Sequence, residues 1–250
     1  MIIAPARETD VSQLMDLWLE AFGETKEEVL SFFREIFPLC RPWCAKDGDT
    51  LCAMAYALPQ TLKVGEKQLP VAYLYAIATR KSYRGQGLAS RLLEELSRAL
   101  RKEGFAGLLL VPANLPLFDF YEKLGFNPFS YRGKTVISAA ECAVKPLSPE
   151  EYLAVREAFL PPVHNVPPAA VLNHLHLFAW GGGCAAAERT GDGIVFRELL
   201  GDPVSAGGVL QSFGAETGTA VLPMGDIPYA VAKPLTEPFP ETGYFAFAME

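Results

Sequence analysis

A buried strand followed directly by an amphipathic helix is the clearest pattern of apolar and polar positions in this chain. Residues 71–79 form an apolar run, rich in β-branched and aromatic side chains, that predicts a strand buried in a core. From Leu88 to Leu100, leucines recur at helical spacing, while most charged residues fall on the rest of the helix surface. Between the two elements, residues 83–89 read Tyr-Arg-Gly-Gln-Gly-Leu-Ala. The chain therefore turns through two glycines into a helix.

This turn has the features of a phosphate-binding site. A helix N-terminus leaves backbone N–H groups without acceptors, and the helix dipole favours negative charge there. A P-loop would need Lys and then Ser or Thr after the last glycine, where this chain has Leu88 and Ala89. A dinucleotide fingerprint would need three glycines in a different order. A plain glycine turn between two core elements is the alternative interpretation.

A second pattern lies about thirty residues downstream. Residues 107–111 predict another short buried strand, which Asn114 follows, and the next helix carries Tyr121 and ends at Gly125. The Asn114 amide can hydrogen-bond a ligand between two strands, and the Tyr121 hydroxyl can donate a proton to a leaving group. Gly125 can end the helix in a left-handed conformation. Taken alone, Tyr121 could equally be a core residue with a satisfied hydroxyl.

Together the two patterns resemble the GCN5-related N-acetyltransferase (GNAT) family. The resemblance rests on Arg84, Gly87 and Ala89 in the turn, then on Asn114, on Tyr121 seven residues later, and on the closing Gly125-Phe126. It implies acetyl-CoA as co-substrate and Tyr121 as the general acid that protonates the departing thiolate. The cofactor-binding residues it implies are Ile77, Ala78, Thr79, Arg84, Gly85, Gln86, Gly87, Leu88, Ala89 and Asn114.

The order of elements before residue 143 also matches that family. Residues 2–4 predict a strand, and capping pairs Asp10 with Gln13 and Thr25 with Glu28 open two helices that run through Phe22 and Phe37. Residues 43–46 and 51–58 form a hairpin, and a second hairpin arm leads into the strand at residue 71. We expect an α/β GNAT fold, with a mixed, mostly antiparallel central sheet flanked by helices.

A second unit is predicted to begin at residue 144. Ser148 and Glu151 form a new capping box with Pro149 at the first helical position. Strands follow at residues 184–188, 194–199, 219–222 and 229–233, without a second Arg-x-x-Gly-x-Ala turn. We predict a catalytic acetyl-CoA-binding domain at 1–143 and a degenerate GNAT-like domain without a cradle at 144–250. A plain support domain is the simpler interpretation of the second unit.

This tandem order resembles the bacterial acetyltransferases of the enhanced-intracellular-survival type, although the sequence does not include their third, sterol-carrier-like domain. The final segment, residues 244–249, is apolar right up to Glu250, which favours docking of the tail. The resemblance implies that the terminal carboxylate of Glu250 takes part in deprotonating the amine. A closing edge strand is the alternative role for this segment, and a water chain ending on Tyr75 is the rival proton route.

Composition is that of an ordinary enzyme. The chain has 250 residues, of which 50% are hydrophobic and 20% charged, enough for two packed units. A net charge of −7 argues against a nucleic-acid surface and mildly favours a cationic acceptor. No apolar window is long enough to span a membrane, and Arg7, Glu8 and Asp10 interrupt any signal-peptide core, so we expect a cytoplasmic protein.

Metal binding is not expected. The five cysteines are scattered and suit buried reduced thiols better than disulfides. Cys40 and Cys44 lack a second pair, and the His174 and His176 pair lacks an acidic or cysteine partner.

The sequence thus predicts transfer of an acetyl group from acetyl-CoA to a primary amine of a small molecule or peptide, by direct attack. The alternative is a CoA-sensing or scaffold module that binds acetyl-CoA without turnover. No nucleic acid or membrane partner is expected, and the oligomeric state stays open.

Overall fold

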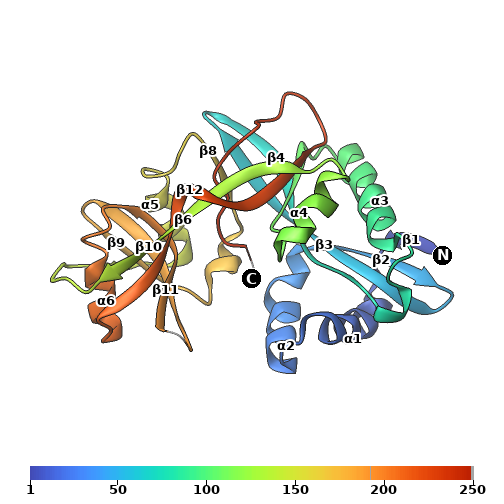
Figure 1. The fold of residues 1–250 in the computed structure, drawn as a ribbon, viewed down its shortest axis with the longest axis horizontal. Helices are drawn as coiled ribbons and strands as arrows, with labels where there is room; N and C mark the ends of the chain where they lie inside the picture. Colours follow the sequence, from blue (N-terminus) through green and yellow to red (C-terminus); the bar gives the residue numbers. More distant parts are fainter. Residues whose placement is uncertain (192, 249–250) are drawn as a thin grey trace. The chain divides into compact units, whose positions relative to one another are not determined.

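The computed structural model describes residues 1–191 and 193–248, and these fall into two units whose sequences interleave (Figure 1). The first unit comprises Met1–Thr61, Leu69–Asn127 and Val231–Phe239. The second comprises Leu62–Gln68, Pro128–Ala230 and the chain from Pro240 onward. The predicted single boundary at residue 143 therefore differs from this division, in which each unit consists of three segments. Residues 128–143 belong to the second unit, and a late segment returns to the first.

The sheet of the first unit explains why this late segment returns. Its strands run in the order β1, β2, β3, β4, β5 and β12, and the last residues of β12 pair antiparallel with β5, from Val231↔Leu110 to Pro234↔Gly107. The pairs β1–β2 and β2–β3 are antiparallel, whereas β4 and β5 are parallel. Their bounds are Ile2–Pro5 (β1), Arg41–Asp47 (β2), Thr50–Val64 (β3), Lys67–Thr79 (β4), Gly107–Leu110 (β5) and Thr217–Pro234 (β12).

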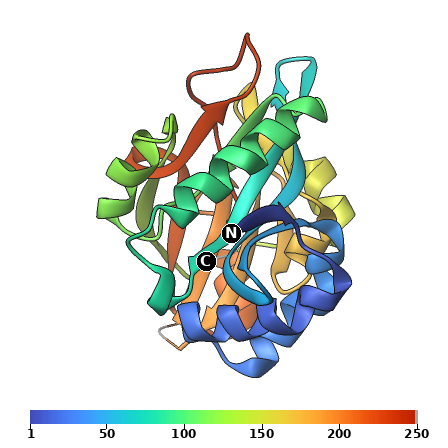
Figure 2. The ribbon, with the colours of Figure 1, turned by 90° about the vertical axis from the view of Figure 1, so that its right-hand side faces the viewer.

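Helices cover both faces of this sheet (Figures 1 and 2). On one face, α1 and α2 pack on Met54 and Tyr56 of β3. On the other, α3 and α4 pack on the alanines that alternate with those residues, such as Ala53 and Ala55. Residues 51–58 of β3 are all apolar because both faces of the strand are buried there. The helices are α1 (Val11–Phe22), α2 (Lys26–Glu35), α3 (Leu88–Lys102) and α4 (Leu115–Glu122), with short 3-10 turns at Glu8–Asp10, Phe37–Leu39 and Lys81–Tyr83.

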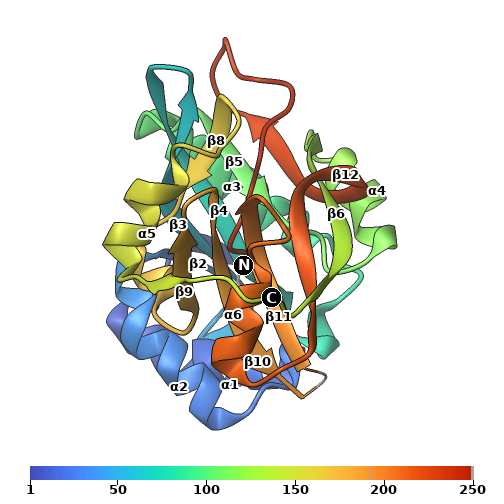
Figure 3. The ribbon, with the colours of Figure 1, turned by 90° about the vertical axis from the view of Figure 1, so that its left-hand side faces the viewer.

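The strands of the second unit pair in the order β12, β11, β10, β9 and β7, with β6 paired to β12 (Figure 3). Only β11 and β12 are parallel among the pairs with a described register. Helix α6 packs on β10 and β11 around Phe196 and Leu210. The elements are β6 (Asn127–Ser138), β7 (Lys145–Pro146), α5 (Pro149–Arg156), β8 (Val163–Val166), a 3-10 turn at Ala169–Leu172, β9 (His176–Trp180), β10 (Gly183–Thr190), β11 (Gly193–Gly201) and α6 (Gly207–Phe213).

Two of the three predicted capping pairs form. Thr25 accepts from the Glu28 N–H and Ser148 from the Glu151 N–H, and each glutamate closes its capping box. The prediction for Asp10 and Gln13 was wrong, because both side chains have partners on the β2–β3 hairpin instead. Asp10 pairs with Lys46 and also accepts from the Arg7 N–H at 2.9 Å. The Gln13 side chain accepts from the Leu51 N–H at 2.8 Å.

The strands of the second unit were only partly predicted. The sequence indicated two strands at 219–222 and 229–233, where the structure has the single strand β12. Pro223 and Pro228 interrupt the apolar pattern there without ending the strand. The short strands β7, β8 and β9 were not predicted, since their apolar positions are few or irregular.

All five cysteines are free thiols in the structure. Within residues 1–191 and 193–248, no three His, Cys, Asp or Glu side chains gather as a metal would require. Over the same residues, no helix combines the length and the apolar character needed to cross a bilayer.

Candidate active site

The turn between β4 and α3 takes the conformation that its glycines predict. Gly85 has φ +77° and Gly87 has φ +69°, and Gly87 is the N-cap residue of α3. A β-carbon added to either glycine would meet no atom within 4 Å. The need for glycine therefore comes from the left-handed backbone and not from crowding within the protein.

Backbone N–H groups along this turn lack protein acceptors. No hydrogen bond within the described part of the chain uses the N–H groups from Gly85 to Ser90, and the first bond of α3 runs from Arg91 N–H to Gly87 O at 3.1 Å. No side chain caps this helix end, and residues 84–87 are exposed. Consecutive donors at the positive end of a helix suit an anion such as a pyrophosphate.

Two side chains fix the turn to the rest of the unit. The Arg84 side chain donates from Nε to the Thr79 carbonyl at 3.0 Å, which ties the turn to the end of β4. Glu20 of α1 accepts from the Lys81 N–H at 2.8 Å and from Arg80 Nη1 at 2.9 Å. The Lys81 N–H lowers the pKa of the Glu20 carboxyl most, and Arg80 lowers it further. No local pattern predicts this role of Glu20, because its partners lie some sixty residues away.

Strands β4 and β5 separate beside the turn. Their paired residues end at Tyr73↔Leu109, whereas β4 continues to Thr79. Between these points Ala76 has φ +47°, an unusual value for a residue with a β-carbon. Ile77, Ala78 and Thr79 thus lie beyond the last pair, where their backbone has no β5 partner. This is the segment for which the sequence predicted cofactor contacts.

Tyr121 lies on α4 with its ring in the core of the first unit. Its side chain contacts Phe120 and Phe126 at ring-centroid distances of 5.1 and 5.7 Å, and the residue is 7% exposed. Burial raises the pKa of Tyr121 to about 12, so the hydroxyl keeps its proton at neutral pH. No hydrogen-bond partner of the hydroxyl is found in residues 1–191 and 193–248.

Asn114 and Gly125 bracket the same helix. Asn114 is the N-cap residue of α4 but makes no side-chain capping bond, and it is exposed. Its side-chain amide is thus not used in a capping bond. Gly125 has φ +83°, the left-handed conformation expected after α4.

Aromatic side chains fill the other face of the sheet. Trp18 of α1 lies 4.4 Å from Phe32, 5.6 Å from Tyr56 and 5.5 Å from Tyr75, measured between ring centroids. The indole N–H of Trp18 donates to Glu24 Oε2 at 2.9 Å. Glu24 stands in the short link between α1 and α2.

Glu250, the predicted catalytic carboxylate, lies outside the described residues. The apolar segment before it is buried in the second unit, with Tyr244 4% and Phe245 1% exposed. Asn165 of β8 holds this segment, since its side chain accepts from the Ala246 N–H at 2.9 Å and donates to the Ala246 carbonyl at 3.0 Å.

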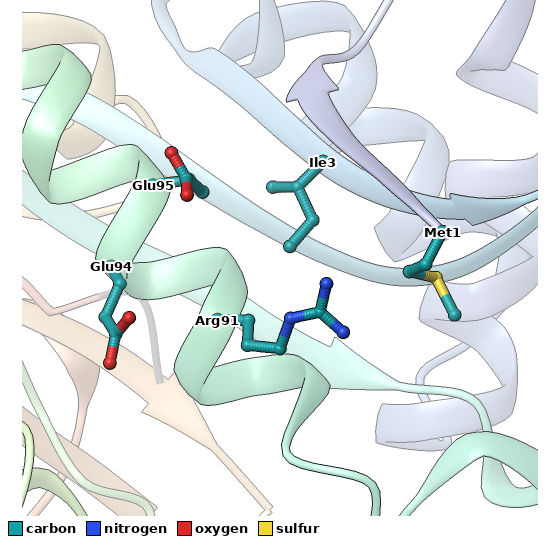
Figure 4. Close-up of a pocket in the computed structure, with 5 residues that line it drawn as sticks. All are labelled: Met1, Ile3, Arg91, Glu94 and Glu95. Atoms are coloured by element: carbon teal, nitrogen blue, oxygen red, sulfur yellow. The ribbon is translucent and has the colours of Figure 1, made fainter.

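A depression of about 280 Å³ lies between β1 and α3 (Figure 4). It is lined by Met1, Ile3, Arg91, Glu94 and Glu95, and its lining is mixed in charge. It includes none of the predicted site residues, so we assign no ligand to it.

A family model described as an acetyltransferase (GNAT) domain matches residues 3–129, just over half of the chain. The chain belongs to the GNAT family. The matched segment contains the β4–α3 turn, Asn114 and Tyr121.

Solved structures show that the likeness in fold extends beyond that domain. A GCN5-related N-acetyltransferase from Kribbella flavida has a TM-score of 0.75 at 17% identity, over 94% of this chain and 72% of that one. Eis1 from Mycobacterium abscessus has a TM-score of 0.72 at 13% identity, over 94% and 74%. The GNAT fold expected from the sequence is thereby confirmed.

One curated relative is a much longer protein. The glycylpeptide N-tetradecanoyltransferase of Neurospora crassa is 25% identical over 113 residues, which cover 40% of this chain and 20% of that protein. The match therefore spans about a fifth of the length of that relative.

Proposed function

We propose that this GNAT protein transfers an acetyl group from acetyl-CoA to a primary amine of a small molecule or peptide. The observation that carries the proposal is the series of N–H groups from Gly85 to Ser90, which have no protein acceptors at the N-terminus of α3. These donors would hold the pyrophosphate, with Arg84 beside them. The backbone of Ile77, Ala78 and Thr79 and the Asn114 amide would hold the pantetheine arm.

The chemistry required of this chain is modest, because acetyl-CoA supplies an activated thioester. In a direct transfer, a bond forms between the amine nitrogen and the acyl carbon while the carbon–sulfur bond breaks. Tyr121 keeps its proton at neutral pH, since burial raises its pKa, and it donates that proton to the departing sulfur. The proton lost by the amine goes to a base, for which we propose Glu250, with a water chain ending at Tyr75 as the alternative.

For the second unit we propose a supporting role without cofactor binding. Its residues up to 191 and from 193 to 248 hold no equivalent of the exposed glycine turn, and the start of its helix α6 is occupied by the chain itself. Gly207 and Gly208 lie so close to residues 138–142 that an added β-carbon would come within 2.5 Å of Ala140 N and 2.2 Å of Cys142 O.

Turnover with a panel of polyamines, aminoglycosides and peptides, followed by release of the free CoA thiol, tests the proposal. Amine-dependent thiol release with acetyl-CoA is expected. Micromolar binding of acetyl-CoA by calorimetry, together with no release for any amine, would favour a CoA-sensing module. Absence of both binding and release would overturn the assignment of the turn itself.

A further inference from the structure

The chain enters the β4–α3 turn through the short 3-10 turn Lys81–Tyr83. The Tyr83 N–H donates to the Arg80 carbonyl at 2.9 Å, and the Arg84 N–H donates to the Lys81 carbonyl at 3.4 Å. The course of this 3-10 turn therefore sets where the open donors of residues 85–90 begin. A single turn of this kind is not stable by itself, so its position depends on contacts from other elements.

Arg80, the N-cap residue of the 3-10 turn, is bonded to the buried start of β3. Its N–H donates to the Cys52 carbonyl at 2.8 Å, and its Nε donates to the Leu51 carbonyl at 2.7 Å. Leu51 and Cys52 are both 0% exposed. These two bonds hold the backbone and the guanidinium of Arg80 in place, which leaves Nη1 to pair with Glu20 of α1 at 2.9 Å.

Glu20 uses both of its carboxylate oxygens on this segment. Oε1 accepts from the Lys81 N–H at 2.8 Å, and Oε2 accepts from Arg80 Nη1. The Arg80 side chain makes no capping bond, so a carboxylate from a distant helix caps the 3-10 turn instead. Glu20 lies in the last turn of α1, and α1 packs in the core of the first unit. The acceptor for the Lys81 N–H is therefore carried by a rigid element.

A fixed entrance matters because the donors that follow are only lightly held. Residues 84–87 are exposed, and Gly85 and Gly87 have left-handed backbones in open space. Glycine loses more conformational freedom on ordering than any other residue, and a site that is already ordered binds its ligand more tightly. Since both oxygens of Glu20 are occupied within the protein, what Glu20 can supply to the site is the position of the turn.

We propose that Glu20 is a positioning residue for CoA, which acts by capping the Lys81 N–H and so holding the entrance of the β4–α3 turn. This proposal rests on the assignment of that turn under the proposed function. Glu20 contacts no ligand in this role, and it affects the affinity for CoA without taking part in acetyl transfer.

The test compares the affinity for CoA, measured by calorimetry, in two variants of Glu20. Glu20→Ala leaves the Lys81 N–H without its acceptor and is expected to raise the Kd for CoA about tenfold. Glu20→Gln keeps an oxygen for that N–H, so its Kd should stay within about threefold of the wild type. The turnover number at saturating acetyl-CoA should be unchanged in both variants.

Glu157→Ala is the matched control for a general loss of stability. Glu157 pairs with Lys63 in the second unit, and the two carboxylate side chains are similarly exposed, 32% for Glu157 and 28% for Glu20. Removing either carboxylate should lower the free energy of unfolding to a similar extent. Only Glu20→Ala should weaken the binding of CoA.

A second substitution tests the mechanism by rescue. Lys81 is the first residue of the 3-10 turn, and Arg80 before it has φ −51° and ψ 140°, a conformation that a following proline allows. Proline at residue 81 would fix the backbone and remove the N–H that Glu20 caps. The double variant Glu20→Ala with Lys81→Pro should therefore regain a Kd for CoA within about threefold of the wild type.

The outcomes separate this inference from the proposed function. Wild-type affinity in Glu20→Ala, equal weakening in Glu20→Ala and Glu157→Ala, or no recovery in the double variant would overturn the role of Glu20 while leaving the acetyltransferase assignment intact. Binding of CoA that depends on Glu20, together with no amine-dependent release of thiol by the wild type, would support the inference and count against the proposed function.

Discussion

Both units contain a strand, a turn, a helix and a parallel strand. The backbone donors at the helix N-terminus are open in the first unit and used by the protein itself in the second. In the first unit β4, α3 and β5 follow one another, and in the second β11, α6 and β12 do. α3 has 15 residues and begins at an exposed glycine turn without a side-chain cap. α6 has 7 residues. The same local order therefore does not by itself produce a ligand site.

What differs is whether the protein supplies its own acceptors. Before α6, the Asp202 carboxylate accepts from the N–H groups of Val204 and Ser205, at 3.1 and 3.0 Å. Hydrogen bonds from Ser205 lower the pKa of Asp202 most, so the carboxylate is ionised at neutral pH. A protein anion thus takes up donors of the kind that the β4–α3 turn leaves open.

The second unit also satisfies its buried charges internally. Arg156 and Glu198 are both 0% exposed and form a two-point ion pair, with Arg156 Nη2 at 2.7 Å from Glu198 Oε1 and Nε at 3.0 Å from Oε2. The hydroxyls of Tyr152 and Tyr244 donate to the same carboxylate at 2.7 and 2.8 Å. The β4–α3 turn of the first unit thus has open donors, whereas these donors and charges of the second unit are satisfied within the protein.

The largest expected effect is on the open turn. Gly87→Glu should abolish CoA binding, because the variant places a side chain on a left-handed residue and brings negative charge to the phosphate donors. Gly214→Glu is the matched control, since Gly214 in the second unit has φ +64° and equally open space. Calorimetry should show normal CoA affinity for the control alone. Equal affinities in both variants would show that the turn does not bind CoA.

Variants of the buried Arg156–Glu198 network should change the free energy of unfolding and not the binding of CoA. Arg156→Met leaves Glu198 buried without its ion-pair partner, which is expected to cost about 3–5 kcal/mol of unfolding free energy. Arg98→Met removes an arginine from exposed pairs with Glu94 and Glu95, and is expected to cost about 0.5 kcal/mol. Urea unfolding measures both. Similar losses in the two variants would contradict the contrast between open and closed charges.

Tyr121→Phe should lower the turnover number about a hundredfold and leave CoA affinity unchanged, because the ring stays and only the proton donor is lost. Since burial raises the pKa of Tyr121 to about 12, the hydroxyl remains protonated as the pH rises through the ordinary tyrosine value. The ratio of wild-type to variant rates should therefore stay constant from about pH 7 to about pH 10. A ratio that falls toward one across that range would place the functional pKa elsewhere.

The smallest effect is expected from opening the turn before α6. Asp202→Ala removes the internal acceptor, but residues 138–142 still cover the start of the helix. The double variant Gly87→Glu with Asp202→Ala should therefore bind no CoA by calorimetry. Recovered binding in the double variant would mean that the missing ligand site of the second unit is due to Asp202 alone.

The candidate site was predictable from the sequence where local geometry decides it. Two left-handed glycines, a leucine stripe and an Asn-to-Tyr spacing are properties of short segments, and Gly85, Gly87, α3 and α4 have the conformations that these segments predict. The capping boxes at Thr25 and Ser148 formed for the same reason. Backbone conformation and helical periodicity act over a few residues, so a single sequence contains them.

Contacts between distant segments were decided only by the tertiary structure. Pairing of β12 with β5 interleaves the units, and no local signal tells residues 231–234 which strand edge to join. Asp10 and Gln13 do not form a capping pair, because their side chains bind Lys46 and the Leu51 N–H of the β2–β3 hairpin instead. Trp18 and Tyr75 became neighbours only through the packing of α1 on the sheet. In each case the deciding free energy comes from groups far apart in the chain, which no short pattern of residues encodes.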